Sequence, residues 1–142
     1  MRRFNQAWML DAKNGVAIWG MASILSTTGE FKSAFELYAE AETLVEEEQR
    51  IPCQMDYARV MGLVGAMNQD QSLMESALAR FSELYQRAPE HTKNLQNWAR
   101  LLFARGQYAK AWEKIKLAEK TPNASQLDQT FIAQLQSKMP RP

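Results

Sequence analysis

Three segments of this chain repeat one spacing of turn, small and large apolar residues. They are Gly29-x4-Ala34-x3-Tyr38-x2-Ala41, Ser72-x4-Ala77-x3-Phe81-x2-Leu84 and Gly106-x4-Ala111-x3-Ile115-x2-Ala118. The step from Ser72 to Gly106 is 34 residues, a period typical of two-helix units that stack into a solenoid. A chain with this pattern is expected to fold into repeated helical hairpins, so an all-α fold is predicted.

Composition restricts the class of protein further. The chain has 142 residues and a formal net charge of +1, which gives no electrostatic reason to expect a nucleic acid partner. No apolar run approaches the roughly 20 residues of a spanning helix, so no membrane span is expected. Cys53 is the single cysteine, which excludes an internal disulfide and a metal site with several cysteines.

Apolar residues at helical spacing predict about eight helices. The five prolines fall outside the predicted helices, as expected if prolines end helices. Gly29 and Gly106 lie where one helix of a pair ends, a position that favours the left-handed conformation of glycine. The predicted helices span residues 2–10, 15–27, 31–48, 55–68, 71–87, 92–104, 108–120 and 125–138.

The pattern resembles the tetratricopeptide repeat (TPR) family over nearly the whole chain, as in bacterial proteins that contain such repeats. The resemblance implies a right-handed solenoid of helical hairpins in a single domain, 1–142. The first and third units carry the signature well, and the middle unit is degenerate, with Ser72 in place of the turn glycine. The residues that carry it are Ile18, Trp19, Ala22, Gly29, Phe31, Ala34, Tyr38 and Ala41, then Met61, Gly65, Ala77, Phe81 and Pro89, then Leu95, Ala99, Gly106, Tyr108, Ala111, Ile115, Ala118 and Pro122.

The expected organisation begins with a half repeat and ends with a cap helix. Gly29 and Ser72 are 43 residues apart, so an insertion is expected, with a loop through Ile51 and Pro52. The tail 139–142 is expected to be loose. The segments are a half repeat (1–14), repeat 1 (15–48), the insertion (49–57), degenerate repeat 2 (58–91), repeat 3 (92–124) and the cap helix with its tail (125–142).

The resemblance also implies a binding site, because the first helix of each TPR hairpin lines the concave face of the solenoid. The residues that would point into this groove offer an aromatic side chain at one end and amide and guanidinium donors at the other. Such a groove suits a peptide or helix of a partner protein with an apolar anchor and an acidic group. The predicted groove residues are Trp19, Ser23, Ser26, Arg59, Leu63, Lys93, Gln96, Asn97, Arg100 and Phe103.

The family members that bind chaperone tails use basic and asparagine residues on successive helices to clamp two carboxylates. Lys93 and Asn97 match part of that clamp. Trp19 and Ser23 stand where the clamp needs a basic residue and an asparagine, so the resemblance does not extend to chaperone-tail binding. For Trp98, the helical spacing favours a place in the core.

A second hypothesis is a structural role through self-association. The segment 1–14 matches the second helix of a repeat whose first helix is absent, as in a truncated or fragmentary form of a longer protein. The residues that would meet the missing helix are Met1, Phe4 and Trp8, and an exposed apolar patch of this kind marks an interface. Alternatively, this segment folds down onto the domain or frays.

The inventory of catalytic residues is small. His91 has no second ligand or nucleophile near it in sequence. Arg50 is near Cys53, but so are Glu46, Glu47 and Glu48, so a reactive thiolate is not favoured. No phosphate-binding or hydrolase motif is present. The sequence therefore predicts a non-enzymatic adaptor without cofactor or metal. A cytoplasmic location is favoured for the chain as given, and a periplasmic or lipid-anchored one if a longer parent was trimmed.

Charge is divided unevenly along the chain. Residues 1–48 hold four Lys or Arg against eight Asp or Glu, while residues 49–142 hold thirteen against eight. Two interpretations are open. The charges are ordinary solvated helix faces, or they form a bipolar surface that orients an acidic partner or supports head-to-tail contacts, which salt would weaken.

Overall fold

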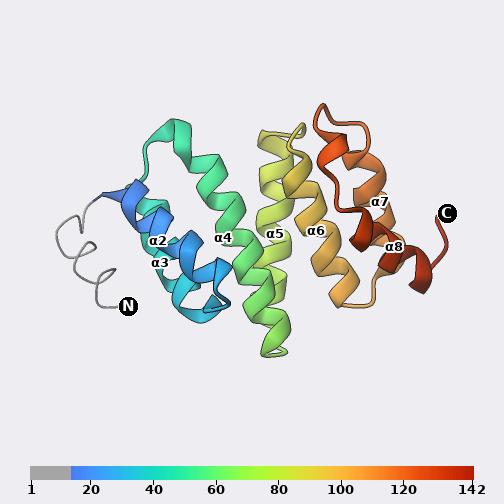
Figure 1. The fold of residues 1–142 in the computed structure, drawn as a ribbon, viewed down its shortest axis with the longest axis horizontal. Helices are drawn as coiled ribbons and strands as arrows, with labels where there is room; N and C mark the ends of the chain where they lie inside the picture. Colours follow the sequence, from blue (N-terminus) through green and yellow to red (C-terminus); the bar gives the residue numbers. More distant parts are fainter. Residues whose placement is uncertain (1–13) are drawn as a thin grey trace. The chain divides into compact units, whose positions relative to one another are not determined.

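A computed structural model describes residues 14–142. These residues form seven α-helices and no strand, so the all-α prediction is confirmed for this part of the chain. The predicted helix 2–10 lies outside the described residues. The helices are α2 (Gly15–Thr27), α3 (Phe31–Leu44), α4 (Glu47–Met67), α5 (Gln71–Arg87), α6 (Thr92–Ala104), α7 (Tyr108–Ala118) and α8 (Gln129–Lys138), with a 3-10 turn, η1 (Ala124–Gln126), before α8 (Figure 1).

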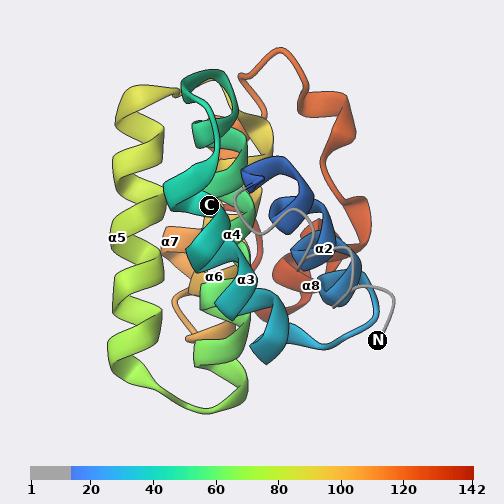
Figure 2. The ribbon, with the colours of Figure 1, turned by 90° about the vertical axis from the view of Figure 1, so that its left-hand side faces the viewer.

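The chain forms two compact units, Met1–Val64 and Gly65–Pro142. In the first, α2 and α3 pack along each other as a hairpin (Figures 1 and 2). Gly29 has a φ of +86° in the turn between them, which confirms the predicted left-handed cap. At the other end of the pair, a Cβ on Gly15 would lie 2.6 Å from the carbonyl carbon of Leu44, so glycine lets the two backbones meet there.

The core of the first unit follows the spacing that the sequence shows. Ala22 and Ala34 are both fully buried, which allows the helices to approach closely. Ile18 and Cys53 share one apolar cluster, although they come from α2 and α4. Burial of these apolar side chains is the main contribution to the stability of a helical hairpin, because helix propensity alone is weak.

The second unit contains a hairpin of α6 and α7, with α5 packed on α6 and α8 on α7. Figure 2 shows α5 along its full length. Gly106 has a φ of +76° in the turn before α7, again as predicted. The buried core residues of this unit are Leu95, Ala99, Leu102, Ala111, Trp112, Ile115, Ala118, Leu127, Phe131 and Leu135.

The turn between α4 and α5 lies between the predicted helices 55–68 and 71–87, but its register in the repeat differs from the pattern. Ser72 takes the place of the turn glycine in the pattern, yet it is an exposed residue inside α5. Gln69 takes the left-handed conformation instead, with a φ of 52°, and the side chain of Asp70 caps α5 by accepting from the Leu73 N–H at 3.0 Å. The left-handed residue thus comes three residues before Ser72, close to one helical turn, so Ala77 stays on the buried face.

The predicted loop through Ile51 and Pro52 is wrong. The chain leaves α3 at Leu44 and enters α4 at Glu47, and Pro52 lies inside α4. The extra residues thus lengthen a helix rather than form a loop. Pro52 is the sixth residue of α4, beyond the N–H groups that lack a helical partner, so its missing N–H removes one helical hydrogen bond.

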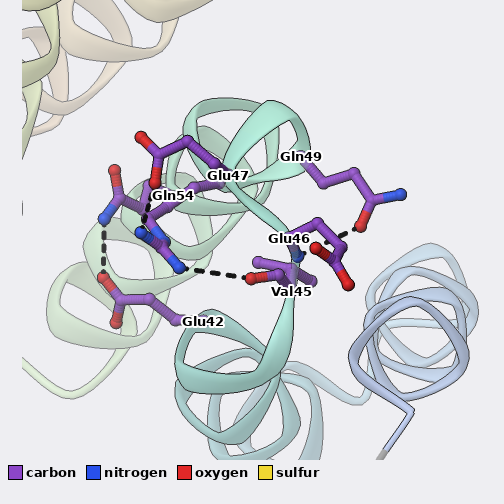
Figure 3. Close-up of polar contacts among 7 residues, drawn as sticks. Glu42, Val45, Glu46, Glu47, Gln49 and Gln54 are labelled. Carbon is purple, nitrogen blue, oxygen red and sulfur yellow. Dashed lines mark hydrogen bonds and ion pairs between the residues drawn. The ribbon is translucent and has the colours of Figure 1, made fainter.

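Side-chain contacts support this early start of α4 (Figure 3). Arg50 Nη1 lies 2.6 Å from Glu47 Oε2, and Arg50 Nη2 donates to the Val45 carbonyl at 3.3 Å. Gln54 Nε2 donates to Glu42 Oε1 at 3.2 Å, which links α4 to α3. Side chains of α4 thus bond both to the connecting segment, at Val45, and to the end of α3, at Glu42.

The tail 139–142 is bound rather than loose as predicted. Arg141 makes two hydrogen bonds of 2.8 Å to the carboxylate of Glu119, and its guanidinium lies 4.6 Å from the centre of the Trp112 ring. The Trp112 indole N–H donates to the Met139 carbonyl at 2.8 Å. Because Trp112 is buried, this bond satisfies a donor that would otherwise be left unpaired.

Candidate functional site

The predicted binding residues of α2 form one row on the helix. Trp19, Ser23 and Ser26 are spaced by four and three residues, so they share a face. The Trp19 indole N–H donates to Asp56 Oδ2 on α4 at 2.9 Å. One turn further on, the hydroxyl oxygen of Ser23 lies 3.2 Å from that of Tyr38. The row is therefore held in place by hydrogen bonds to both neighbouring helices of its unit.

Arg59 completes this cluster from α4. Its Nη2 donates to Ser26 Oγ at 2.6 Å, while Ser26 itself is buried. Asp56 and Arg59 are three residues apart and both are half-buried, so each can contact α2 and still meet solvent. Burial raises the pKa of Tyr38, and the hydrogen bond with Ser23 opposes that shift.

Four of the five residues predicted in the first unit thus lie together: Trp19, Ser23, Ser26 and Arg59. Asp56 and Tyr38, which were not predicted, form hydrogen bonds with members of this group. The fifth, Leu63, is half-buried one turn beyond Arg59 on α4. The repeat pattern selected residues on both α2 and α4, but it did not indicate that Asp56 and Tyr38 would bond to the row on α2. We call Trp19, Ser23, Ser26, Asp56 and Arg59 the α2–α4 cluster.

The predicted residues of α6 are engaged differently, since three of them hold α8. Arg100 Nη2 lies 2.7 Å from Asp128 Oδ2, and Gln96 Oε1 accepts from the Asp128 backbone N–H at 2.6 Å. The Phe103 ring packs edge-on against that of Phe131, with centroids 5.5 Å apart. The Arg100 guanidinium, one of the donors assigned to a partner's acidic group, is thus engaged by the chain's own cap helix, and Gln96 is engaged there as an acceptor.

The remaining two residues on α6 have opposite exposures. Asn97 is 4% exposed, and its side-chain nitrogen makes no hydrogen bond within residues 14–142. Lys93 is exposed. The residues predicted for self-association, Met1, Phe4 and Trp8, lie outside the described part of the chain.

The groups with catalytic potential are not arranged for chemistry in the described residues. Cys53 is fully buried, and burial, with Asp56 and Glu42 nearby, raises the pKa of its thiol to about 12. His91 is the N-cap residue of α6, without a side-chain capping bond. Within residues 14–142, no group of three or more His, Cys, Asp or Glu side chains is arranged to hold a metal ion.

The sequence analysis missed a hollow in the second unit. It has a volume of about 440 Å³. Trp98 was expected in the core, but it is half-buried at this hollow, with the Lys114 ammonium 4.0 Å from its ring centre. Arg105 bridges to Glu75 at 2.7 Å. The lining residues are Glu75, Leu78, Trp98, Leu102, Arg105, Gln107, Lys110, Glu113 and Lys114.

The separation of Trp98 and Lys114 by sixteen residues explains why the hollow was missed, because only the α6–α7 hairpin brings them together.

None of the helices described here is both long and apolar enough to cross a membrane. A comparison with models of known protein families gives no match to this chain, and no curated protein matches it significantly in sequence.

Proposed function

We propose that this protein is a non-enzymatic adaptor of the TPR type that binds a peptide or helix of a partner protein. The α2–α4 cluster is the part of the proposed groove that recognises the partner. A partner segment with an apolar side chain next to a carboxylate fits this chemistry.

The local geometry of the hairpins supports the solenoid part of the proposal. The two turns that carry glycine in the repeat pattern both have positive φ angles. The alanines at the repeat positions Ala22, Ala34, Ala99 and Ala111 are all fully buried. These are the features by which a TPR-like sequence would build closely packed pairs, and they occur in both units.

The observation that carries the binding proposal is the fixed placement of an indole and a guanidinium on one face. Trp19 is half-buried with its N–H already bonded to Asp56, so its exposed surface is available for apolar contact. Arg59 has five N–H donors, which is more than its partners Ser26 and Tyr38 accept. A partner carboxylate can therefore bind the guanidinium without losing the contact to α2.

The side chains of the α2–α4 cluster are already fixed in position, which favours binding compared with mobile surface side chains. Side chains already held by hydrogen bonds lose less conformational entropy when a partner binds. Gln96, Arg100 and Phe103 are held just as firmly, but they contact α8. We therefore assign them to the attachment of the cap helix, and recognition to the α2–α4 cluster.

A peptide-display selection tests this proposal. A random library is selected on the full chain and, in parallel, on a Trp19→Ala/Arg59→Ala variant. A Val16→Ala/Ile24→Ala variant is the matched control, because these two exposed apolar residues also lie on α2. Enrichment of acidic–apolar peptides on the wild type and the control, with loss on the cluster variant, is expected. Equal enrichment on all three proteins contradicts the proposal.

A further inference from the structure

The hollow of the second unit has a mostly polar and charged lining, with a small apolar floor and a basic rim. Leu78, Leu102 and Trp98 supply the apolar surface, and Lys114 lies against the Trp98 ring. Lys110 is exposed at the rim and makes no ion pair with another described residue. A ligand with an apolar side chain flanked by carboxylates fits this arrangement.

Two carboxylates of the hollow limit what can bind. Glu75 is already paired with Arg105, so its charge is compensated. Glu113 lines the hollow without an ion pair to another described residue, and it disfavours an acidic ligand at its own side. The attraction is therefore concentrated at Lys110 and Lys114.

The first unit presents a complementary surface at the turn between α3 and α4. Leu44 is 38% exposed there. Few other large apolar side chains are exposed among the described residues. Glu46 and Glu48 are exposed beside it, and neither forms an ion pair with another described residue. Figure 3 shows the side chains of Glu46 and Glu47 extending from different sides of this turn. We call Leu44, Glu46, Glu47 and Glu48 the acidic turn.

We propose that the acidic turn of one copy of this chain docks into the hollow of a second copy. In this contact Leu44 meets the apolar floor at Trp98, while the carboxylates of Glu46 and Glu48 face Lys110 and Lys114. The contact joins two different surfaces. It is therefore heterologous, and every copy can donate one turn and accept another.

The distribution of charge supports a second copy as the occupant. Residues 14–64 hold three Lys or Arg against eight Asp or Glu, whereas residues 65–142 hold eleven against seven. When the acidic turn of one copy contacts the hollow of another, a negatively charged first unit meets a positively charged second unit. Two first units, or two second units, would repel each other. Such complementarity speeds encounter and fixes orientation more than it adds affinity, so a reversible, salt-sensitive association is expected.

Sedimentation velocity of the full chain across a concentration series at low and high salt tests the proposal. The wild type is expected to form larger species as concentration rises, with association at least about tenfold weaker at 0.5 M than at 0.05 M salt. A Lys110→Ala/Lys114→Ala variant and a Glu46→Gln/Glu48→Gln variant should each stay monomeric. Variants with the same charge changes elsewhere, Lys120→Ala/Lys138→Ala and Glu83→Gln/Glu90→Gln, should associate like the wild type.

Mixing the two monomeric variants is the decisive arm. Each retains one intact surface, so the mixture should form a one-to-one complex that grows no further. A wild-type chain that stays monomeric at every concentration overturns the proposal. Association that survives both variants but is lost in Phe4→Glu/Trp8→Glu also overturns it. Neither result affects the peptide-display test, because that test concerns a different surface.

Discussion

Arg100 on α6 and Asp128 at the start of α8 form an ion pair of 2.7 Å between residues 28 positions apart. Asp128 also caps α8, because its Oδ1 accepts from the Thr130 and Phe131 N–H groups. These backbone bonds, followed by the contact with Arg100, lower the pKa of Asp128. One carboxylate thus starts the cap helix and attaches it to the preceding hairpin.

The two roles of Asp128 separate by mutation. Asp128→Ala removes the cap and the ion pair, so it should lower the melting temperature by several degrees. Arg100→Ala leaves the cap intact and removes an exposed pair, which contributes little in water, so its effect should be smaller. Thermal unfolding followed by circular dichroism measures both. An Arg100→Ala variant less stable than Asp128→Ala would contradict this division.

The helix boundaries show how far sequence reasoning reaches. The predictions for α2, α5 and α6 agree with the structure to the residue. Side chains that can cap a helix, Asn14 and Asp70, stand before α2 and α5. The start of α4 was missed because Pro52 was treated as a helix terminator. Local rules could not show that burial of the apolar face around Cys53 outweighs one missing hydrogen bond.

The glycines give a prediction in which the same substitution has opposite effects. Gly20 lies in α2 and Gly106 in a turn, and at neither would a Cβ come within 4 Å of another group. Gly20→Ala should stabilise by about 0.5–1 kcal/mol, because alanine favours a helix. Gly106→Ala should destabilise by about 1 kcal/mol, because its φ is left-handed. Urea unfolding measures both, and a shared sign would contradict the assigned turn.

The bond between Glu119 and Arg141 predicts a pH dependence. Hydrogen bonding to Arg141 lowers the pKa of Glu119 below its ordinary value of 4.5. The folded state therefore binds this proton less readily than the unfolded chain. The resulting stability is present above about pH 5 and is lost as the pH falls through the lowered pKa.

Glu119→Gln should therefore reduce the fall in stability between pH 5 and pH 3, and Arg141→Ala should do the same. The coupling between them in a double-mutant cycle should be at most about 1 kcal/mol near pH 7, because both side chains are partly exposed. Urea unfolding at several pH values supplies the data. An unchanged acid slope in both variants is inconsistent with a bound tail.

The burial of Cys53 predicts slow chemistry at its thiol. A thiol whose pKa is raised to about 12 by burial has almost no thiolate near neutral pH, and reagents reach it only when the unit opens. Labelling by a disulfide reagent should be at least about a hundredfold slower in the native protein than in urea. Comparable rates in both conditions would place Cys53 at the surface.

The candidate site was predictable only in part. The resemblance to TPR hairpins led to Trp19, Ser23 and Ser26 as groove residues, and their spacing by four and three residues puts them on one helix face. The contact of Arg100 with Asp128 and the hollow at Trp98 join residues far apart in the sequence. Such contacts depend on how the helices pack against each other. The spacing of residues within one helix does not specify which side chains of another helix they will contact.

The most direct test of the adaptor proposal is calorimetric titration of a display-selected peptide into the full chain and four variants. Trp19→Ala and Arg59→Ala should each weaken binding by about tenfold or more, whereas Ile24→Ala, on an exposed part of the same helix, should bind like the wild type. Trp19→Phe, which keeps an aromatic ring, should retain part of the affinity and exclude a folding defect. Equal affinity in all of these proteins would show that the α2–α4 cluster does not recognise the partner.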